Sequence, residues 1–164
     1  MVDSCGACQS CQRGREQHCD NNATLFTYGY PHEASPTGIT QGGYSNNIVV
    51  KEHFAIKIPR SISLEQAASL LCAGITTYSP LLQAPVKKGD VVGVAGIGGL
   101  GHLAIKLAKA RGAEGVGFTT TENKMEDIRR FGAKEAVVVD PVDKLKVYNH
   151  LVDYMISTIR STTT

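Results

Sequence analysis

Four of the five cysteines in this chain lie within its first 19 residues, as Cys5, Cys8, Cys11 and Cys19. Gaps of two residues let consecutive sulfurs point toward one centre from a tight turn, and four thiolates satisfy the tetrahedral preference of Zn²⁺. Residues 1–30 have little apolar periodicity, so a cross-link such as a bound metal ion is needed to hold their fold. Because four ligands leave no open coordination position, the spacing predicts a structural zinc site, not a catalytic one.

Disulfides and an iron–sulfur cluster are the competing interpretations of these cysteines. Disulfides suit a secreted protein, but the N-terminus has neither the basic start nor the apolar segment of a signal peptide. Cluster-binding runs also use C-x2-C-x2-C, but they continue with a shorter gap and a final proline, whereas Asp20 follows Cys19 here. A cytoplasmic location is expected, and a reducing cytosol favours metal over disulfides.

The composition is that of an ordinary globular protein. Its 164 residues are 42% hydrophobic and 20% charged, enough for a core in one domain or in parts of two. The net charge is +2 and the basic residues are dispersed, unlike the basic face of a nucleic-acid-binding protein. No apolar run approaches the roughly 20 residues of a membrane span. We therefore expect neither a nucleic-acid nor a membrane partner.

From Asp90 onward the chain alternates between strand-like and helix-like segments. Strands are expected over 91–97, 116–121, 136–139 and 154–159, and helices over 100–108, 123–131 and 145–151. Gly112 and Gly132 are expected to end the first two helices. Such alternation predicts an α/β fold, with helices packed on a parallel sheet.

The region before it is predicted to be a small β region followed by a helix. Strand-like runs occur at 44–50 and 54–58, between glycines and a proline. Ser63 can cap the helix, because Gln66 stands at the third following position as in a capping box. The residues expected to face the core are Ala67, Ala68, Leu70 and Leu71.

The hexamer GIGGLG at 96–101 fits the pattern G-x-G-x-x-G. It follows a strand and opens a helix, which is the context that a dinucleotide-binding fingerprint requires. The first glycine permits the turn, the second lets the backbone approach a pyrophosphate, and the third lets helix and strand pack closely. The helix N-terminus offers free N–H groups to the phosphates. A dinucleotide site is therefore favoured over a glycine-rich turn without a ligand.

The end of the second strand indicates which dinucleotide would bind. An NAD site expects Asp or Glu there, to bind the ribose 2′-hydroxyl. This chain has three threonines at 119–121, followed by Glu122, Asn123 and Lys124. Hydroxyls and a lysine suit a 2′-phosphate, so NADP is favoured. Two alternatives stay open. A shift of one residue would bring Glu122 within reach of the ribose 2′-hydroxyl, or Lys124 is a solvated lysine that binds no ligand.

The fifth cysteine and the histidines belong to no motif that the residues alone define. Cys72 lies among apolar residues, and a single cysteine in such surroundings is more often a core residue. A surface or loop position is expected for each histidine: His18, His32, His53, His102 and His150.

Taken together, four segments resemble the cinnamyl alcohol dehydrogenase branch of the zinc-containing medium-chain dehydrogenases: VDSCGACQSCQRGREQHC, TQGGYSNNIVV, LLCAGITTYSPL and GIGGLGHLAIKLAKARG. The resemblance covers nearly the whole chain. It implies a partial GroES-like β lobe of the catalytic domain over 1–72 and the first part of an NADP-binding Rossmann domain over 73–164. It also implies reversible hydride transfer between NADP(H) and an alcohol or aldehyde, and a homodimer.

The resemblance further assigns roles to individual residues. Cys5, Cys8, Cys11 and Cys19 would hold the structural zinc, and Cys72 would be a ligand of the catalytic zinc. Thr76 would be the second catalytic residue, near the nicotinamide. The residues implied to bind the dinucleotide are Thr76, Gly96, Gly98, Gly99, Leu100, Gly101, Thr120, Thr121, Lys124 and Thr158.

The chain departs from the family pattern at both ends. Family members have an upstream cysteine and a Gly-His-Glu segment that complete the catalytic zinc site, and they continue well beyond the fourth strand. A catalytic zinc needs about three protein ligands. The expected protein is therefore a fragment of an NADP-dependent alcohol dehydrogenase, inactive alone. The alternatives are a truncated, non-catalytic chain that binds zinc and a dinucleotide, and a redox-sensing cysteine module.

Overall fold

The computed structural model describes residues 1–139, 146, 148 and 150–159. The chain forms two compact units, Met1–Pro59 (unit 1) and Arg60–Thr164 (unit 2). The domain boundary expected between residues 72 and 73 falls within unit 2. That boundary separates functional domains, whereas the units reflect compactness, so it stays a prediction.

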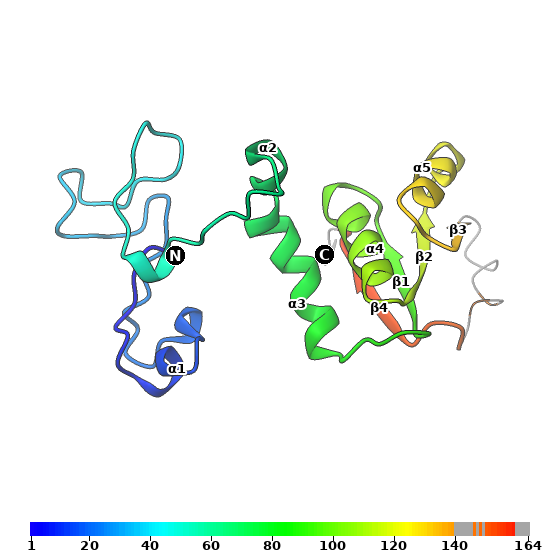
Figure 1. Ribbon diagram of the computed structural model, residues 1–164, viewed down its shortest axis with the longest axis horizontal. Helices are drawn as coiled ribbons and strands as arrows, with labels where there is room; N and C mark the ends of the chain where they lie inside the picture. The colour runs from blue at the N-terminus through cyan, green and yellow to red at the C-terminus, as the bar shows by residue number, and fades with distance from the viewer. Residues whose placement is uncertain (140–145, 147, 149, 160–164) are drawn as a thin grey trace, which may run out of the picture. The chain divides into compact units, whose positions relative to one another are not determined.

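Unit 1 contains little regular secondary structure (Figure 1). Isolated β-bridges join Asp3 to Leu25 and Pro31 to Ile39. The strands expected over 44–50 and 54–58 do not form, so that prediction is wrong. A strand is stable only beside a paired neighbour, and the described part of unit 1 brings none alongside these runs. The helical elements of unit 1 are α1 (Gln9–Gln12), η1 (Glu16–His18) and η2 (Glu52–Phe54).

Unit 2 begins with a helical segment made of α2 (Leu64–Ala67), the π-helical turn η3 (Leu70–Gly74) and α3 (Ile75–Gln83). The predicted cap is confirmed, because the Ser63 hydroxyl accepts the Gln66 N–H at 3.4 Å. Of the four residues expected to face the core, only Ala67 is buried; Ala68, Leu70 and Leu71 are exposed. For Leu70 and Leu71 the assumed α-helical period fails because α2 ends at Ala67 and the π-helical turn, with its wider repeat, begins at residue 70.

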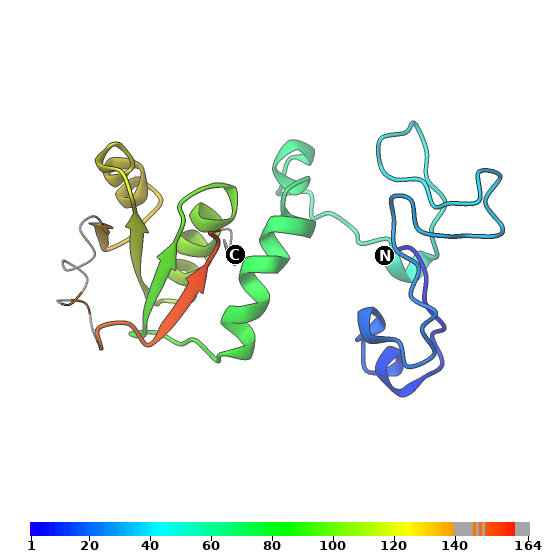
Figure 2. The ribbon, with the colours of Figure 1, turned by 180° about the vertical axis from the view of Figure 1, so that it is seen from behind.

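A four-stranded sheet forms the centre of unit 2, and its strands are parallel, as predicted. The strand order is β3-β2-β1-β4. The strand order has a switch point at β1, because β2 lies on one side of β1 and β4 lies on the other (Figure 2). Such a switch point, at the carboxyl ends of the strands, is where open α/β sheets bind their ligands. The strands are β1 (Val91–Ala95), β2 (Glu114–Thr119), β3 (Glu135–Val138) and β4 (Tyr154–Ser157).

Helices α4 (Gly99–Ala110) and α5 (Met125–Arg130), with the short turn η4 (Glu122–Lys124), complete the described elements of unit 2. Both predicted helix ends are confirmed, because Gly112 and Gly132 adopt φ angles of +82° and +104°. Within the helix expected over 145–151, residues 145, 147 and 149 lie outside the described residues, so that helix stays a prediction.

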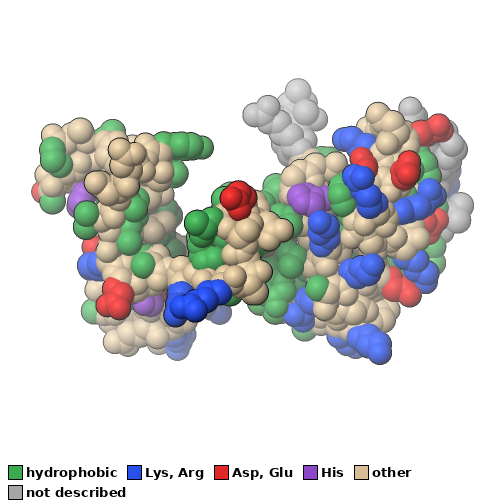
Figure 3. All heavy atoms as spheres, turned by 45° about the horizontal axis from the view of Figure 1, so that its top comes forward, with side chains coloured by type: hydrophobic (Ala, Val, Ile, Leu, Met, Phe, Trp, Pro, Cys, Tyr) green, Lys and Arg blue, Asp and Glu red, His purple; other side chains and the backbone are tan. Residues whose placement is uncertain are grey.

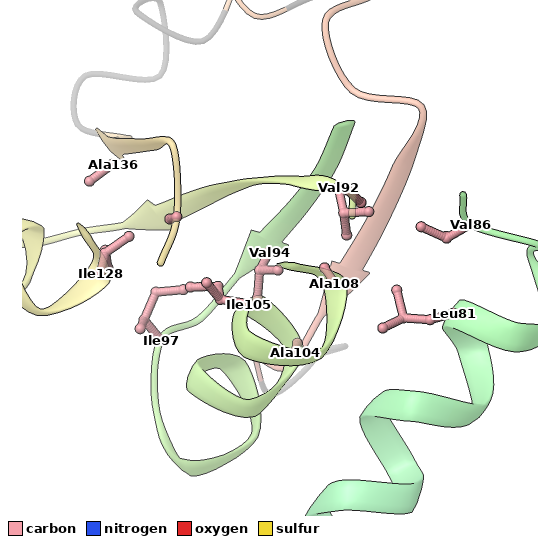
Figure 4. Packing of buried hydrophobic residues seen from close by; sticks show 12 residues of the cluster. Leu81, Val86, Val92, Val94, Ile97, Ala104, Ile105, Ala108, Ile128 and Ala136 are labelled. Atoms are coloured by element: carbon pink, nitrogen blue, oxygen red, sulfur yellow. The ribbon is translucent and has the colours of Figure 1, made fainter. Parts of the chain in front are cut away.

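The core of unit 2 lies between the sheet and the helices. Val92 and Val94 of β1 point toward α4, whose Ala104 and Ile105 face them (Figure 4). Leu81 of α3 joins the same cluster. Fully burying such an aliphatic side chain contributes about 1.5–3 kcal/mol. This packing holds the helix that begins at the glycine hexamer firmly against the sheet.

The charged side chains of unit 2 are dispersed over the face in Figure 3, where basic groups lie among acidic ones. None of the described helices is long and apolar enough to cross a bilayer. The face of the sheet that points away from α4 carries a second, smaller apolar cluster around Val116, Phe118 and Val137.

Candidate functional site

The four clustered cysteines of unit 1 converge on one point. Their sulfur atoms all lie within 4.8 Å of one another. The Sγ–Sγ distances are 3.8 Å for Cys5 and Cys11 and 3.9 Å for Cys8 and Cys19. Sulfurs placed tetrahedrally at about 2.3 Å from zinc stand about 3.8 Å apart, whereas bonded sulfurs stand about 2.05 Å apart. The geometry therefore fits a zinc tetrathiolate, and all four thiols are free.

Backbone N–H groups of the loop stabilise the thiolates. Cys8 caps α1 and accepts the N–H of Cys11 at 3.5 Å, while the N–H of Cys8 donates to the Cys5 sulfur at 3.4 Å. The pKa of Cys5 is lowered to about 6, first by the backbone N–H of Ala7 and then by that of Cys8. Because the thiolate is the form that binds metal, these N–H groups favour the metal-binding form of Cys5.

A buried carboxylate links this loop to the end of unit 1. Glu16 is only 8% exposed, and its Oε1 lies 2.5 Å from Nε2 of His53 in η2. Its main-chain carbonyl accepts the N–H of Cys19 at 3.1 Å and the hydroxyl of Thr24 at 2.5 Å. The pKa of Glu16 is lowered by its own backbone N–H and then by His53. Glu16 therefore positions the last cysteine of the cluster.

The substitution His53→Ala is expected to lower the unfolding temperature of unit 1 by about 5 °C at pH 7, because it leaves a buried carboxylate unpaired. The lowered pKa of Glu16 means that this contribution is present above pH 4.5 and is lost as the pH falls through the folded-state value. Thermal unfolding with zinc in excess measures the effect. The exposed neighbour Glu52 provides the control, and an equal loss in Glu52→Ala would contradict this role for His53.

The glycines of the hexamer have two different surroundings. Gly96 has a φ of +83°, which turns the chain sharply out of β1. A Cβ atom on Gly101 would lie 2.1 Å from the Gly96 carbonyl oxygen, so this glycine is needed for packing. By contrast, Gly98 and Gly99 have nothing within 4 Å of such an atom. The protein itself therefore requires two of the glycines, while the other two leave open space at the helix N-terminus.

A pocket of about 630 Å³ opens on this turn. Cys72 lines it from the π-helical turn, and Lys124 lines it from η4. Of the residues implied to bind the dinucleotide, those that line it are Gly96, Gly98, Gly99, Leu100, Lys124 and Thr158. The structure thus brings together residues from the glycine turn, the end of β4 and the segment after β2, and their binding roles remain predictions of the family resemblance.

A second pocket of about 660 Å³ lies beside the first, since Gly96 and Lys124 line both. Thr120 lines this second pocket, with apolar side chains such as Phe118 and Met155. Three predicted binding residues line neither pocket. Thr76 and Thr121 are exposed, and Gly101 is buried beneath the turn.

Cys72 is exposed in the π-helical turn, not buried in the core as its residue type predicted. The apolar neighbours behind that prediction, Leu71 and Ile75, are themselves exposed. Within the described residues, Cys72 also belongs to no group of three or more potential metal ligands. These residues therefore fit the structural zinc but do not assemble a catalytic zinc site.

His102 is a pocket residue that the sequence analysis missed. It lies half-buried on α4, not in a loop or fully at the surface. Its Nδ1 is 3.3 Å from the carbonyl oxygen of Gly98, and its ring packs against Phe131 at a centroid distance of 5.3 Å. The available signal was its spacing, since a residue one turn after the glycines shares their side of the helix.

Comparison with known proteins agrees with this geometry. The family model for the alcohol dehydrogenase GroES-like domain matches residues 1–60. The chain is 45% identical to a probable zinc-type alcohol dehydrogenase-like protein of Acanthamoeba polyphaga mimivirus, over 97% of this chain and 39% of that protein. A cinnamyl alcohol dehydrogenase structure from Sorghum bicolor matches with a TM-score of 0.86 and 37% identity, over 96% of this chain and 45% of that one.

The NADP(H) complex of the CAD of Helicobacter pylori gives a TM-score of 0.81 and 42% identity, over 96% of this chain and 44% of that one. The chain spans less than half the length of the relatives it matches, between 39% and 45% for those compared here. Within that span, the similarity includes both the cysteine loop and the glycine turn. The chain therefore belongs to the zinc-type medium-chain alcohol dehydrogenases.

Proposed function

We propose that this chain supplies the structural zinc loop and the NADP(H)-binding turn of an oxidoreductase that transfers a hydride between NADP(H) and an alcohol or aldehyde. The main support is the position of Lys124, which lines both pockets at the switch point of the sheet, beside the glycine turn. The Lys124 cation at this position can bind a phosphate group in addition to the phosphates that the free N–H groups of the helix N-terminus bind.

The surroundings of the second strand end favour NADP over NAD. Thr120 and Lys124 line the pockets, whereas Glu122 lines neither. The shift that would bring Glu122 to the ribose is therefore not needed to explain the site. Thr121, also implied to bind the 2′-phosphate, bonds back to Thr119 through its N–H at 3.3 Å. We infer that Lys124 and Thr120 provide the 2′-phosphate contacts.

NADP(H), when bound, supplies or accepts the hydride, and a catalytic zinc would polarise the reacting oxygen as a Lewis acid. Cys72 lines the same pocket as the glycine turn, which supports its role as one ligand of such a zinc. The described residues provide no companion ligands for it. A non-catalytic chain that binds zinc and a dinucleotide is therefore the second candidate. Thr76 as a nicotinamide neighbour, the homodimer and the cytoplasmic location remain predictions.

Lys124→Ala is expected to weaken NADPH binding about tenfold or more and to leave NADH binding nearly unchanged, because only NADPH carries the 2′-phosphate. Equilibrium titration of the chain with each dinucleotide measures both effects. The matched control is Lys109→Ala, since Lys109 is an exposed lysine on α4 that lines neither pocket. An unaltered chain that binds neither dinucleotide would exclude the proposed function. An equal loss for both would assign Lys124 to the shared phosphates instead.

A further inference from the structure

The hydroxyl of Thr158, just past β4, reaches back to the glycine turn. Its Oγ1 donates to the carbonyl oxygen of Gly96 at 2.5 Å and lies 3.2 Å from that of Ala95. The N–H of Thr158 also donates to the Ala95 carbonyl at 2.9 Å. Thr158 and Gly96 are separated by 62 residues in the sequence. The end of β4 is therefore bonded to the point where the chain leaves β1.

The Gly96 carbonyl is enclosed on its other side by α4. A Cβ atom on Gly101 would lie 2.1 Å from this oxygen and 3.5 Å from the Thr158 hydroxyl, so the Gly101 backbone lies directly against both. No backbone N–H of the described residues donates to this oxygen. Its hydrogen bond therefore comes from the Thr158 side chain, and losing that donor would leave an enclosed carbonyl unpaired.

The direction of this carbonyl matters for the dinucleotide. Gly96 has the positive φ that sets the course of the turn, and the next residues, Gly98 to Leu100, line the pocket at the helix N-terminus. Their N–H groups have no partners within the helix and are free to bind an anion. A fixed Gly96 peptide presents them already oriented, which reduces the ordering cost of binding.

We propose that Thr158 is a positioning residue, which holds the glycine turn in its phosphate-binding conformation through the Gly96 carbonyl. The proposal rests on the proposed function, since it concerns the same dinucleotide site. It differs from the role implied by the family resemblance, in which Thr158 contacts the cofactor itself. A positioning role acts on the pyrophosphate and is independent of the nicotinamide, so the two roles predict different ligand dependence.

The test compares Thr158→Val, which has a similar shape but no hydroxyl, with Thr158→Ser, which keeps the hydroxyl. Each is titrated with NADPH and with 2′-phospho-ADP-ribose, which has the pyrophosphate but no nicotinamide. Thr158→Val is expected to weaken both ligands by the same factor, about tenfold. Thr158→Ser should stay within about twofold of the unaltered chain. A loss confined to NADPH, or no loss at all, would overturn the positioning role.

Amide hydrogen exchange without ligand provides a second measurement. Around the turn, the N–H of Gly96 donates to the Phe118 carbonyl and the N–H of His102 donates to the Gly98 carbonyl. Thr158→Val should speed exchange at these two N–H groups, while Thr158→Ser should not, because only the valine removes the hydrogen bond to the Gly96 carbonyl. Unchanged exchange in Thr158→Val would count against the proposal even in a chain that binds no dinucleotide. Failure of the unaltered chain to bind either ligand would instead exclude the proposed function. If the valine variant does not fold, Thr158→Ala replaces it in both measurements.

Discussion

Removal of zinc is expected to unfold unit 1 while unit 2 keeps its sheet. Neither of the two apolar clusters contains a residue of unit 1. Its buried hydrophobic residues are Cys11 and Cys19, which are themselves proposed zinc ligands. Binding of structural zinc contributes about 10–16 kcal/mol in small zinc-dependent folds. That is as large as the whole free energy of unfolding of most proteins, about 5–15 kcal/mol.

The same loss is expected from Cys8→Ser, because Cys8 both caps α1 and lies within the sulfur cluster. Metal analysis should find one zinc per unaltered chain and none in the variant. Amide exchange should then show residues 1–59 unprotected and residues 91–119 still protected. Cys72→Ser is the matched control and should keep its zinc, since Cys72 lies outside the cluster. Continued protection of residues 1–59 after zinc removal would contradict a structural role for the metal.

Alanine substitutions in the glycine turn are expected to separate stability from binding. In Gly101→Ala the new Cβ would lie 2.1 Å from the Gly96 carbonyl oxygen, a backbone atom that cannot move aside without opening the turn. Such overpacking typically costs about 1–3 kcal/mol, occasionally more. Because the displaced carbonyl also belongs to the binding turn, affinity for NADPH should fall about 100-fold. Thermal unfolding and NADPH titration measure the two losses.

Gly98→Ala is the matched comparison for Gly101→Ala. The protein leaves open space around Gly98, and its φ of −115° suits any residue, so stability should be unchanged. The added methyl would instead occupy the place where a pyrophosphate approaches the backbone. NADPH and NADH should therefore bind about tenfold or more weakly, by the same factor. Full affinity in Gly98→Ala would show that no pyrophosphate lies against this residue.

Local patterns in the sequence were sufficient for the parts of the site that adjacent residues build. The spacing of Cys5, Cys8 and Cys11 places their sulfurs together, since the turn of α1 spans the gap from Cys8 to Cys11 and the loop before it spans the gap from Cys5. The alternation after Asp90 yields the parallel sheet, and GIGGLG falls at the junction of β1 and α4. Such features follow from interactions over three or four residues, which a linear pattern records directly.

The same reasoning failed where a residue's surroundings come from distant segments. The apolar run around Cys72 predicted burial, yet the described part of the chain leaves Leu71 and Cys72 exposed. The strand-like run at 44–50 predicted a strand, but no paired neighbour lies beside it in the described part of unit 1. Burial and strand pairing are properties of what packs against a segment, and the segment's own residues do not specify its partner.

By itself, the sequence determined the zinc loop, the order of strands and helices after Asp90, and the glycine turn, because each depends on neighbouring residues. Tertiary structure alone decided that β4 lies beside β1, that Lys124 lines both pockets, and that the Thr158 hydroxyl anchors the Gly96 carbonyl. The physical reason is sequence distance. Contacts between residues about 60 positions apart arise from how the sheet is ordered, which no local pattern of residue types encodes.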